Sequence, residues 1–208
     1  MKDNYLIIFL LIIAILFRGS IFNLLNNVSS YLISKDESLE VKVLNDKINR
    51  LYNEYNSLLD FKNNINIKED YIITNVLKNN YGFGNLIIPD GDFNLNNEVI
   101  NEEGLVGIIS KKNNKTAEIK KTYDTNLIVK INNETGKIYS KDEDLNLIIK
   151  DVSNYNNISI NDEVFSISGN YIGKVIKIQY DILDNYLTVR TIDFNNLTYV
   201  AVIKDGAW

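Results

Sequence analysis

The sequence contains no histidine, and this absence removes many enzyme classes at once. Ser-His-Asp and Cys-His triads, HExxH metalloprotease helices and metal sites with imidazole ligands all require that side chain. Cysteine is missing as well, which excludes disulfides, thiolate nucleophiles and cysteine-bound metals. Paired carboxylates or lysines could still support catalysis in principle. Because no pattern points to such a site, we expect no catalytic residues, no cofactor and no metal.

An excess of positive charge is also missing. The chain carries 22 Lys and Arg residues against 27 Asp and Glu residues, a formal net charge of −5. Proteins that bind nucleic acids usually present a basic face to the phosphates. The composition therefore predicts no nucleic-acid partner.

One long apolar run, from Tyr5 to Phe17, stands at the start of the chain. It is shorter than the roughly 20 residues of a spanning helix, and its length alone also fits a signal peptide. However, Arg18 can extend its stem to the membrane interface, and apolar residues resume at Ile21. No small-x-small cleavage pattern follows. We predict an uncleaved transmembrane anchor and juxtamembrane helix over residues 1–33. The flanking charges, Lys2 against Arg18 and Lys35, nearly balance, so they do not decide the orientation.

A stalk is predicted over residues 34–66. Ser34 and Glu37 match a capping box, which starts a helix at Lys35. The apolar residues that follow repeat every three or four positions, as in a coiled-coil seam. This seam consists of Val41, Leu44, Ile48, Leu51, Tyr55 and Leu58. We favour a parallel homodimer, because membrane tethering raises the local concentration of partners. The alternative is a single helix that packs on its own β domain or on the bilayer.

The helical period ends after Asn63, and short β-type runs bounded by turn residues fill residues 67–208. No helix is expected between them, which indicates a mainly β fold of two small antiparallel β-barrel-like subdomains. The predicted strands are Tyr71–Leu77, Asn85–Ile88, Glu98–Ile100, Gly104–Ser110, Ala117–Lys120, Asn126–Ile131, Gly136–Tyr139, Leu145–Val152, Glu163–Ile167, Gly173–Tyr180, Leu187–Ile192 and Tyr199–Lys204.

The loop from Asp90 to Asn96 places oxygen ligands at alternate positions, as a calcium-binding loop does. An EF-hand also needs glycine at its sixth position and a carboxylate at its twelfth. Those positions hold Leu95 and Asn101, so we expect a polar turn. Asp124 and Asp193 each follow an apolar run, where a carboxylate can accept turn amides.

Five segments stand in a recognisable order along the chain. They are residues 103–109 (EGLVGII), 119–124 (IKKTYD), 160–169 (INDEVFSISG), 172–175 (IGKV) and 191–197 (TIDFNNL). In this order they resemble the GLVG strand, the next strand, the GDxVxTSG segment, the IGxV segment and the ADFxxL segment of the MreC family of rod shape-determining proteins. Asn161 replaces a usual glycine, Ile108 replaces an arginine, and the loop between Gly169 and Gly173 is short. The chain is thus similar to a divergent, short member. The matching residues, read as structural, are Gly104, Leu105, Gly107, Asp124, Asp162, Gly169, Gly173, Asp193 and Phe194.

The resemblance implies a non-catalytic scaffold of the cell-wall elongation machinery. Such a protein crosses the cytoplasmic membrane once, carries its β domain outside and maintains cell shape by organising peptidoglycan synthesis. The partners implied are a second copy, MreD, the actin-like MreB and a penicillin-binding transpeptidase. A periplasmic-adaptor-like subunit of a transport complex is the alternative. Adaptors send a helical hairpin out of a β domain, whereas here one helical stretch precedes all strands. A double-barrel protease would need the missing histidine.

Overall fold

The computed structural model describes residues 23, 26–28, 39–65, 67, 69–80, 85–180 and 184–204. The predicted anchor run Tyr5–Phe17 and the predicted cap from Ser34 to Glu37 lie outside these residues. Within the described part of the chain, no helix combines the length and the apolar character needed to cross a membrane.

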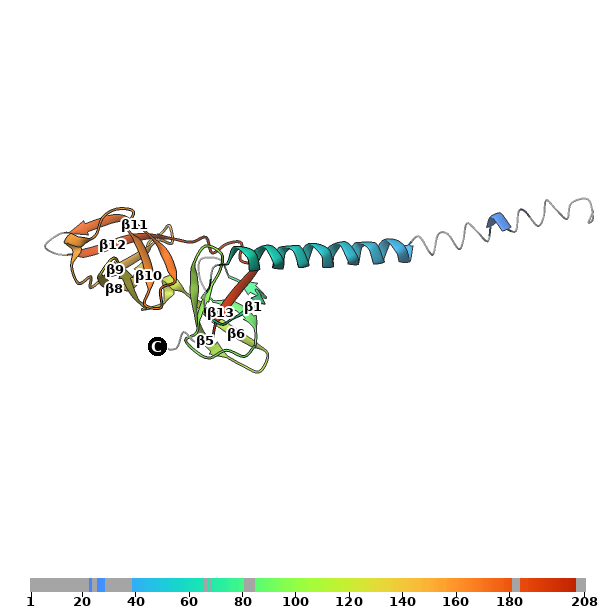
Figure 1. Ribbon diagram of the computed structural model, residues 1–208, viewed down its shortest axis with the longest axis horizontal. Coiled ribbons are helices and arrows are strands. Elements are labelled where there is room, and N and C mark those ends of the chain that lie inside the picture. Colours follow the sequence, from blue (N-terminus) through green and yellow to red (C-terminus); the bar gives the residue numbers. More distant parts are fainter. Residues whose placement is uncertain are drawn as a thin grey trace, which may run out of the picture. The chain divides into compact units, whose positions relative to one another are not determined.

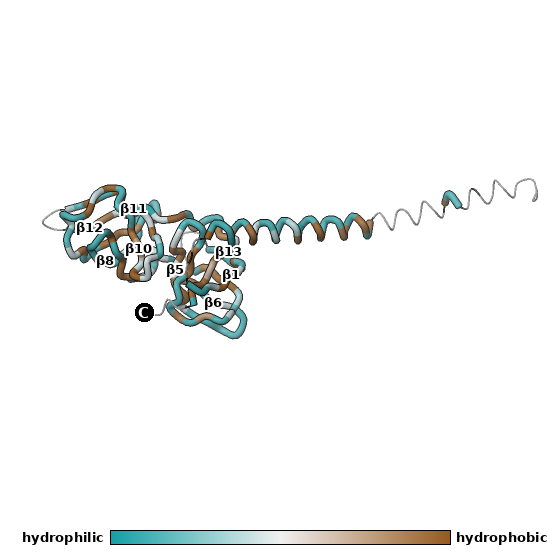
Figure 2. The backbone as a smooth tube through the Cα atoms, in the orientation of Figure 1, coloured by the Kyte–Doolittle hydropathy of each residue, from teal (hydrophilic) through white to brown (hydrophobic). Residues whose placement is uncertain are grey.

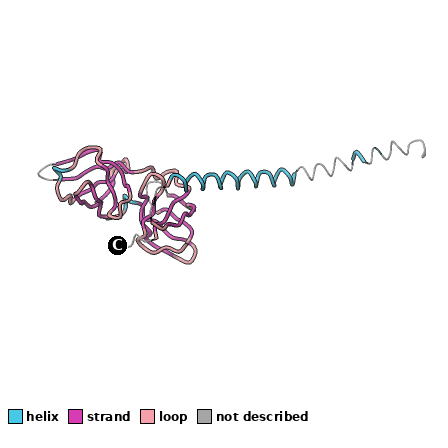
Figure 3. Tube along the Cα trace, viewed as in Figure 1, coloured by secondary structure: helices cyan, strands magenta, loops and turns pink. Residues whose placement is uncertain are grey.

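Residues 39–64 form a continuous helix (Figure 3). The six predicted seam residues all lie on it, and all are exposed, from 38% at Leu58 to 61% at Tyr55. Apolar and polar residues alternate along its turns (Figure 2). An apolar stripe with this spacing is what a partner helix would cover.

The last turn of the helix has a different environment. Phe61 and Ile65 are buried, and the Phe61 ring lies 6.0 Å from the ring of Tyr199 on the last strand. The backbone N–H of Ile65 donates to the carbonyl of Phe61 at 3.0 Å, which closes the final turn. Leu58 ends the exposed stripe, and Phe61 begins the packing of the helix end on the β structure.

The first β subdomain is a seven-stranded antiparallel sheet (Figure 1). Its spatial order is β1-β13-β4-β5-β6-β3-β2. The chain's last strand therefore returns to lie between the first and the fourth. The strands are β1 (Tyr71–Asn75), β2 (Lys78–Asn79), β3 (Leu86–Pro89), β4 (Glu98–Ile100), β5 (Leu105–Lys112), β6 (Thr116–Lys121) and β13 (Tyr199–Ile203).

The second subdomain is a closed six-stranded barrel in the order β10-β11-β12-β9-β8-β7, with β7 paired to β10. Along several of its strands, alternate apolar side chains point inward and are fully buried, for example Val129 and Ile131, or Leu187 and Val189. A three-residue 3₁₀ turn, η1 (Thr122–Asp124), leads from β6 toward it, and η2 (Tyr155–Asn157) lies between its strands. The strands are β7 (Ile128–Ile131), β8 (Glu134–Lys141), β9 (Leu147–Lys150), β10 (Glu163–Ser166), β11 (Tyr171–Tyr180) and β12 (Asn185–Thr191).

The prediction of two barrels needs a correction, because only one of them closes. The ends of the seven-stranded sheet are β1 and β2, which are separated in the chain only by Val76 and Leu77. Two residues span only a short distance, so the sheet must curl until its ends approach. The ends do not pair because Val76 donates to Thr198 on one side and Leu77 donates to Ile87 on the other, each at 2.8 Å. The chain passes from β1 to β2 through Val76 and Leu77, and these two end strands do not pair with each other.

Candidate functional site

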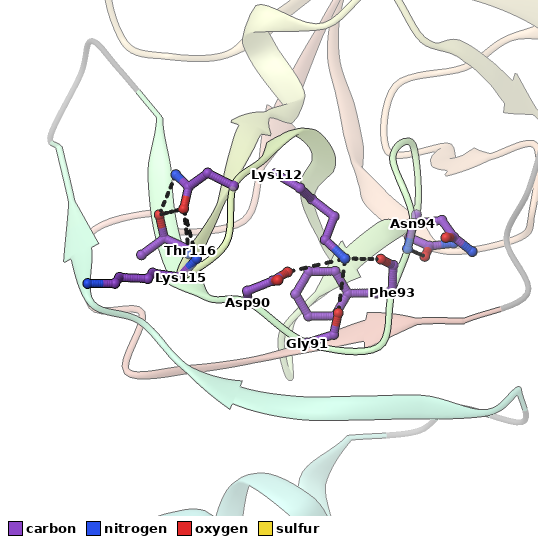
Figure 4. Close-up of polar contacts among 9 residues, drawn as sticks. Asp90, Gly91, Phe93, Asn94, Lys112, Lys115 and Thr116 are labelled. Atoms are coloured by element: carbon purple, nitrogen blue, oxygen red, sulfur yellow. Dashed lines mark hydrogen bonds and ion pairs between the residues drawn. The ribbon is translucent and has the colours of Figure 1, made fainter.

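The loop that resembled a calcium site is built around a lysine. The ammonium of Lys112, at the end of β5, donates to the carbonyls of Gly91 at 3.0 Å and Phe93 at 2.6 Å, and it lies 3.1 Å from a carboxylate oxygen of Asp90. It also lies 4.8 Å from the centroid of the buried Phe93 ring. Figure 4 shows these three oxygens converging on one nitrogen. The ammonium occupies the place that a bound cation would take.

Other groups of this loop have different partners. Asp92 pairs with Lys204 at 2.8 Å, which lowers the pKa of the Asp92 carboxyl. The amide of Asn94 donates to the side chain of Asn97 at 2.6 Å. Among the described residues, no group of three or more acidic side chains is placed to hold a metal. The loop is thus a turn held by an internal cation.

The GLVG strand contacts other chain segments at very short range. A Cβ added at Gly107 would lie 2.1 Å from the carbonyl oxygen of Lys120 on β6, and β5 is bulged against β4 beside it. Gly104 has φ +152°, and an added Cβ would lie 2.4 Å from the carbonyl oxygen of Tyr171 on β11. Leu105 between them is fully buried. Gly104 therefore lies where the seven-stranded sheet meets the closed barrel.

The other glycines of interest lie on the hairpin of β10 and β11. A Cβ at Gly173 would lie 2.0 Å from the carbonyl oxygen of Arg190 on β12. Gly169 has φ +94° in the turn before β11, with open space around it. Close backbone approach thus accounts for Gly173, and backbone conformation accounts for Gly169.

The segment between β12 and β13 packs on the connection between the two subdomains. The ring of Phe194 meets the ring of Tyr123 edge-on at 5.0 Å, and both are buried. The carboxylate of Asp193 accepts the N–H of Asn195 at 2.9 Å, as expected of a turn aspartate. The N–H of Asp193 donates to Glu103 at 3.0 Å.

The remaining predicted aspartates have different partners. Asp124 pairs with Lys141 at 3.2 Å, and the Lys141 ammonium lies 4.0 Å from the centroid of the Tyr123 ring. Asp162 accepts the N–H of Ser159 at 2.7 Å and the amide of Asn132 at 2.8 Å, within the closed barrel. Asp162 therefore lies apart from the group formed by Asp124, Asp193 and Phe194.

A comparison with protein families identifies the family to which the chain belongs. The family profile described as rod shape-determining protein MreC, barrel core, matches residues 92–204, which is more than half of the chain. The chain belongs to the MreC family. The matched region runs from the lysine-held loop through the closed barrel to the end of β13. It contains all of the predicted motif residues.

Solved MreC structures share the fold. MreC from Listeria monocytogenes is 20% identical, with a TM-score of 0.60 over 83% of this chain and 94% of the other. The major periplasmic domain of the cell shape-determining filament MreC is 19% identical, with a TM-score of 0.58 over 66% of this chain and 99% of the other. In a complex between the penicillin-binding protein PBP2 and MreC from Helicobacter pylori, the matching chain is 14% identical, with a TM-score of 0.52 over 66% of this chain and 100% of the other. No curated protein matches the chain.

Sequence reasoning missed two buried charged residues of this MreC domain. Lys121, at the end of β6, is 1% exposed and donates to the carbonyl of Asn80 at 2.7 Å; burial lowers its pKa. Glu98, on β4, is fully buried. The alternation of β6 places Lys121 on the same face as the buried Ala117 and Ile119, so its burial could have been inferred. The hydrogen-bond partners of both side chains lie far away in the sequence, so these partners could not have been inferred from it.

Finally, a groove of about 650 Å³ lies on the closed barrel. Its lining includes the motif residues Asp162 and Gly169, together with Phe165 and Ile167. Ile167 is 46% exposed. The groove combines the apolar side chains of Phe165 and Ile167 with the charged side chains of Lys130 and Glu163.

Proposed function

We propose that this chain is a membrane-anchored, non-catalytic scaffold that maintains cell shape by organising peptidoglycan synthesis during elongation. The observation that carries this proposal is the match of the MreC family profile to residues 92–204, over the described β strands from β4 to β13. That family is named for determining rod shape. A scaffold works through binding surfaces and needs no reactive group.

The proposed architecture has three parts. Residues 1–33 anchor the chain in the cytoplasmic membrane, residues 34–66 form a stalk that pairs with a second copy, and residues 67–208 form the β domain outside. The apolar run Tyr5–Phe17 supports the anchor. The exposed seam on helix 39–64 supports the pairing. A periplasmic location of the β domain is supported by the similar structure described as a major periplasmic domain.

The proposed partners are a penicillin-binding transpeptidase, MreD and a second copy of the chain, which can extend to larger assemblies. The transpeptidase is supported by the similar MreC that was solved in complex with PBP2. Higher assembly is supported by the similar MreC described as a filament. MreD rests on the family resemblance alone.

A crosslinking experiment in the host tests the scaffold role. A photo-crosslinking residue replaces Ile167 in the groove, and a control places the same residue at Lys115, in the exposed turn between β5 and β6. Fluorescent penicillin labels every penicillin-binding protein in the membranes. We expect a labelled adduct from position 167 and none from position 115. If no exposed position of the closed barrel yields a labelled adduct, the transpeptidase is not a direct partner.

A further inference from the structure

Glu98 joins the two β subdomains through hydrogen bonds. It lies on β4, in the middle of the seven-stranded sheet. Its carboxylate oxygen Oε2 accepts the hydroxyl of Ser166 at 3.1 Å and the side-chain amide of Asn170. Both donors belong to the closed barrel, at the end of β10 and in the turn that follows it. Glu98 and Ser166 are both fully buried, so the contact is shielded from solvent.

The turn from Ser166 to Asn170 is shaped to hold this carboxyl. The N–H of Ser166 donates to the carbonyl of Asn170 at 2.8 Å, and the N–H of Asn170 donates to the Ser166 hydroxyl at 3.1 Å. The N–H of Gly169 donates to the carbonyl of Ser166 at 3.0 Å, with Gly169 at positive φ. This turn overlaps the short loop between Gly169 and Gly173, where the sequence departs from the family pattern. It points its polar side chains toward Glu98.

The protonation state of Glu98 depends on this junction. Burial raises the pKa of the Glu98 carboxyl, while hydrogen bonds from Asn170, Ser166 and Ser168 lower it, and the charge of Glu69 raises it further. The residue that faces Glu98 across the β4–β5 ladder, Ile108, is apolar. Several other charged groups on the packed elements have partners of their own: Lys174 pairs with Glu163, Lys204 with Asp92, Lys111 with Glu118 and Lys112 with Asp90, and Glu103 accepts the N–H of Asp193.

We propose that Glu98 and the turn Ser166–Asn170 form a proton-controlled joint between the two β subdomains, which is held closed when Glu98 is protonated and loosens when Glu98 ionises. The physical reason is the cost of a buried carboxylate. An ionised Glu98 is penalised while the joint is closed, and separation of the turn from β4 admits water that relieves this penalty.

The direction of the pH effect follows from the sign of the pKa shift. The pKa of Glu98 in the closed joint lies above its ordinary value, so the closed joint binds its proton more tightly than the open one. The contribution of Glu98 to closure is complete below the ordinary glutamate pKa. It is lost as pH rises through the raised value. A protein whose β domain faces the medium would meet such changes directly.

Distances between spin labels test the joint in the full-length chain in detergent micelles. The chain has no native cysteine, so labels attach only at introduced positions. Lys115→Cys places one label on the exposed turn of the seven-stranded sheet, and Glu143→Cys places the other on an exposed turn of the closed barrel. We expect a narrow distance distribution at pH ~4 and a broader one at pH ~8, on either side of the usual carboxyl range.

Two variants make the outcome specific. Glu98→Gln keeps the size of the side chain but cannot ionise, so the distribution should stay narrow at both pH values. Ser166→Ala removes one donor that favours the ionised form, so it raises the pKa of Glu98 in the closed joint further. The broadening should therefore extend to higher pH, with a higher midpoint, than in the parent chain. Glu163→Gln, an exposed carboxylate on the same strand as Ser166, should leave the parent's pH response unchanged.

Three results would overturn the proposal. The first is a parent distribution that does not change with pH. The second is a pH response that persists in Glu98→Gln, because another group would then control it. The third is a Ser166→Ala midpoint that stays in place or moves to lower pH, and this variant keeps the test valid even if Glu98→Gln fails to fold.

Discussion

The ammonium of Lys112 holds together the loop after β3, as a bound cation would. Three oxygens from the loop after β3 surround its ammonium, and the Phe93 ring lies beside it. The sequence showed the oxygens of this loop but not the cation, because Lys112 lies 21 residues after Gly91. The alternating Asp and Asn residues resemble a calcium-binding loop, but Leu95 and Asn101 at the sixth and twelfth positions predicted a polar turn. Asp92 pairs with Lys204.

Replacing Lys112 with Met should destabilise this loop and the sheet around it. Hydrogen bonds to charged groups contribute about 1.5–3 kcal/mol each, and the partial exposure of Lys112 reduces this, so we expect a loss of about 1–2 kcal/mol. Chemical unfolding of the full-length chain in detergent measures the loss. Lys115→Met, at an exposed position nearby, is the control and should stay within about 0.5 kcal/mol of the parent.

Calcium provides a second readout of the same residue. Because the ammonium already occupies the oxygen cluster, added calcium should not raise the unfolding temperature of the parent chain. A clear rise, or equal stability of the Lys112→Met and Lys115→Met variants, would show that the lysine does not hold the loop.

Two glycines of the β10–β11 hairpin should respond differently to the same substitution. Gly173→Ala drives a Cβ to 2.0 Å from the backbone oxygen of Arg190, so we expect a loss of about 3 kcal/mol or more, comparable to other severe core changes. Gly169→Ala has open space and pays only for its positive φ, about 1–2 kcal/mol. Unfolding curves of the two variants give the comparison. Equal losses would mean that backbone approach is not what requires Gly173.

Among the elements, the alternation of apolar and polar side chains predicted the positions of the strands well. All twelve predicted strands overlap observed ones, because side chains of period two mark a half-buried or buried pleat. The strand β2 was missed, since Lys78 and Asn79 are too few to show any period. The open edge of the first sheet could not be inferred either. It depends on how Val76 and Leu77 cross between strands, which no periodic pattern records.

The helix element carries the prediction of a homodimer. A cysteine at Leu51, an exposed seam position, should form a disulfide with its twin in membranes of the full-length protein. A cysteine at Asn53, on the opposite side of the helix, is the matched control and should crosslink far less. Nonreducing gels measure both. Equal crosslinking at the two positions, or none at Leu51, would mean that the seam does not pair.

Across the whole molecule, the order of the motifs along the chain indicated the family more strongly than any single motif did. The GLVG segment, the strand that ends at Asp124, the Gly169–Gly173 hairpin and the Asp193–Phe194 segment together indicated the MreC family, and the family profile confirms it. The fold explains part of this pattern. Gly104 meets Tyr171, Tyr123 meets Phe194, and Glu103 meets Asp193. Segments that are far apart in sequence therefore meet where the two subdomains join.

Under the proposed function, this chain scaffolds cell-wall synthesis from the membrane. Depletion of the protein in its own host, with cell width and sites of new wall labelling followed by microscopy, tests this role. We predict rounded cells with dispersed wall synthesis, rescued by the full chain and not by a chain that lacks residues 1–33. Unchanged shape and labelling after depletion would contradict the scaffold role, and rescue by the shortened chain would contradict the need for an anchor.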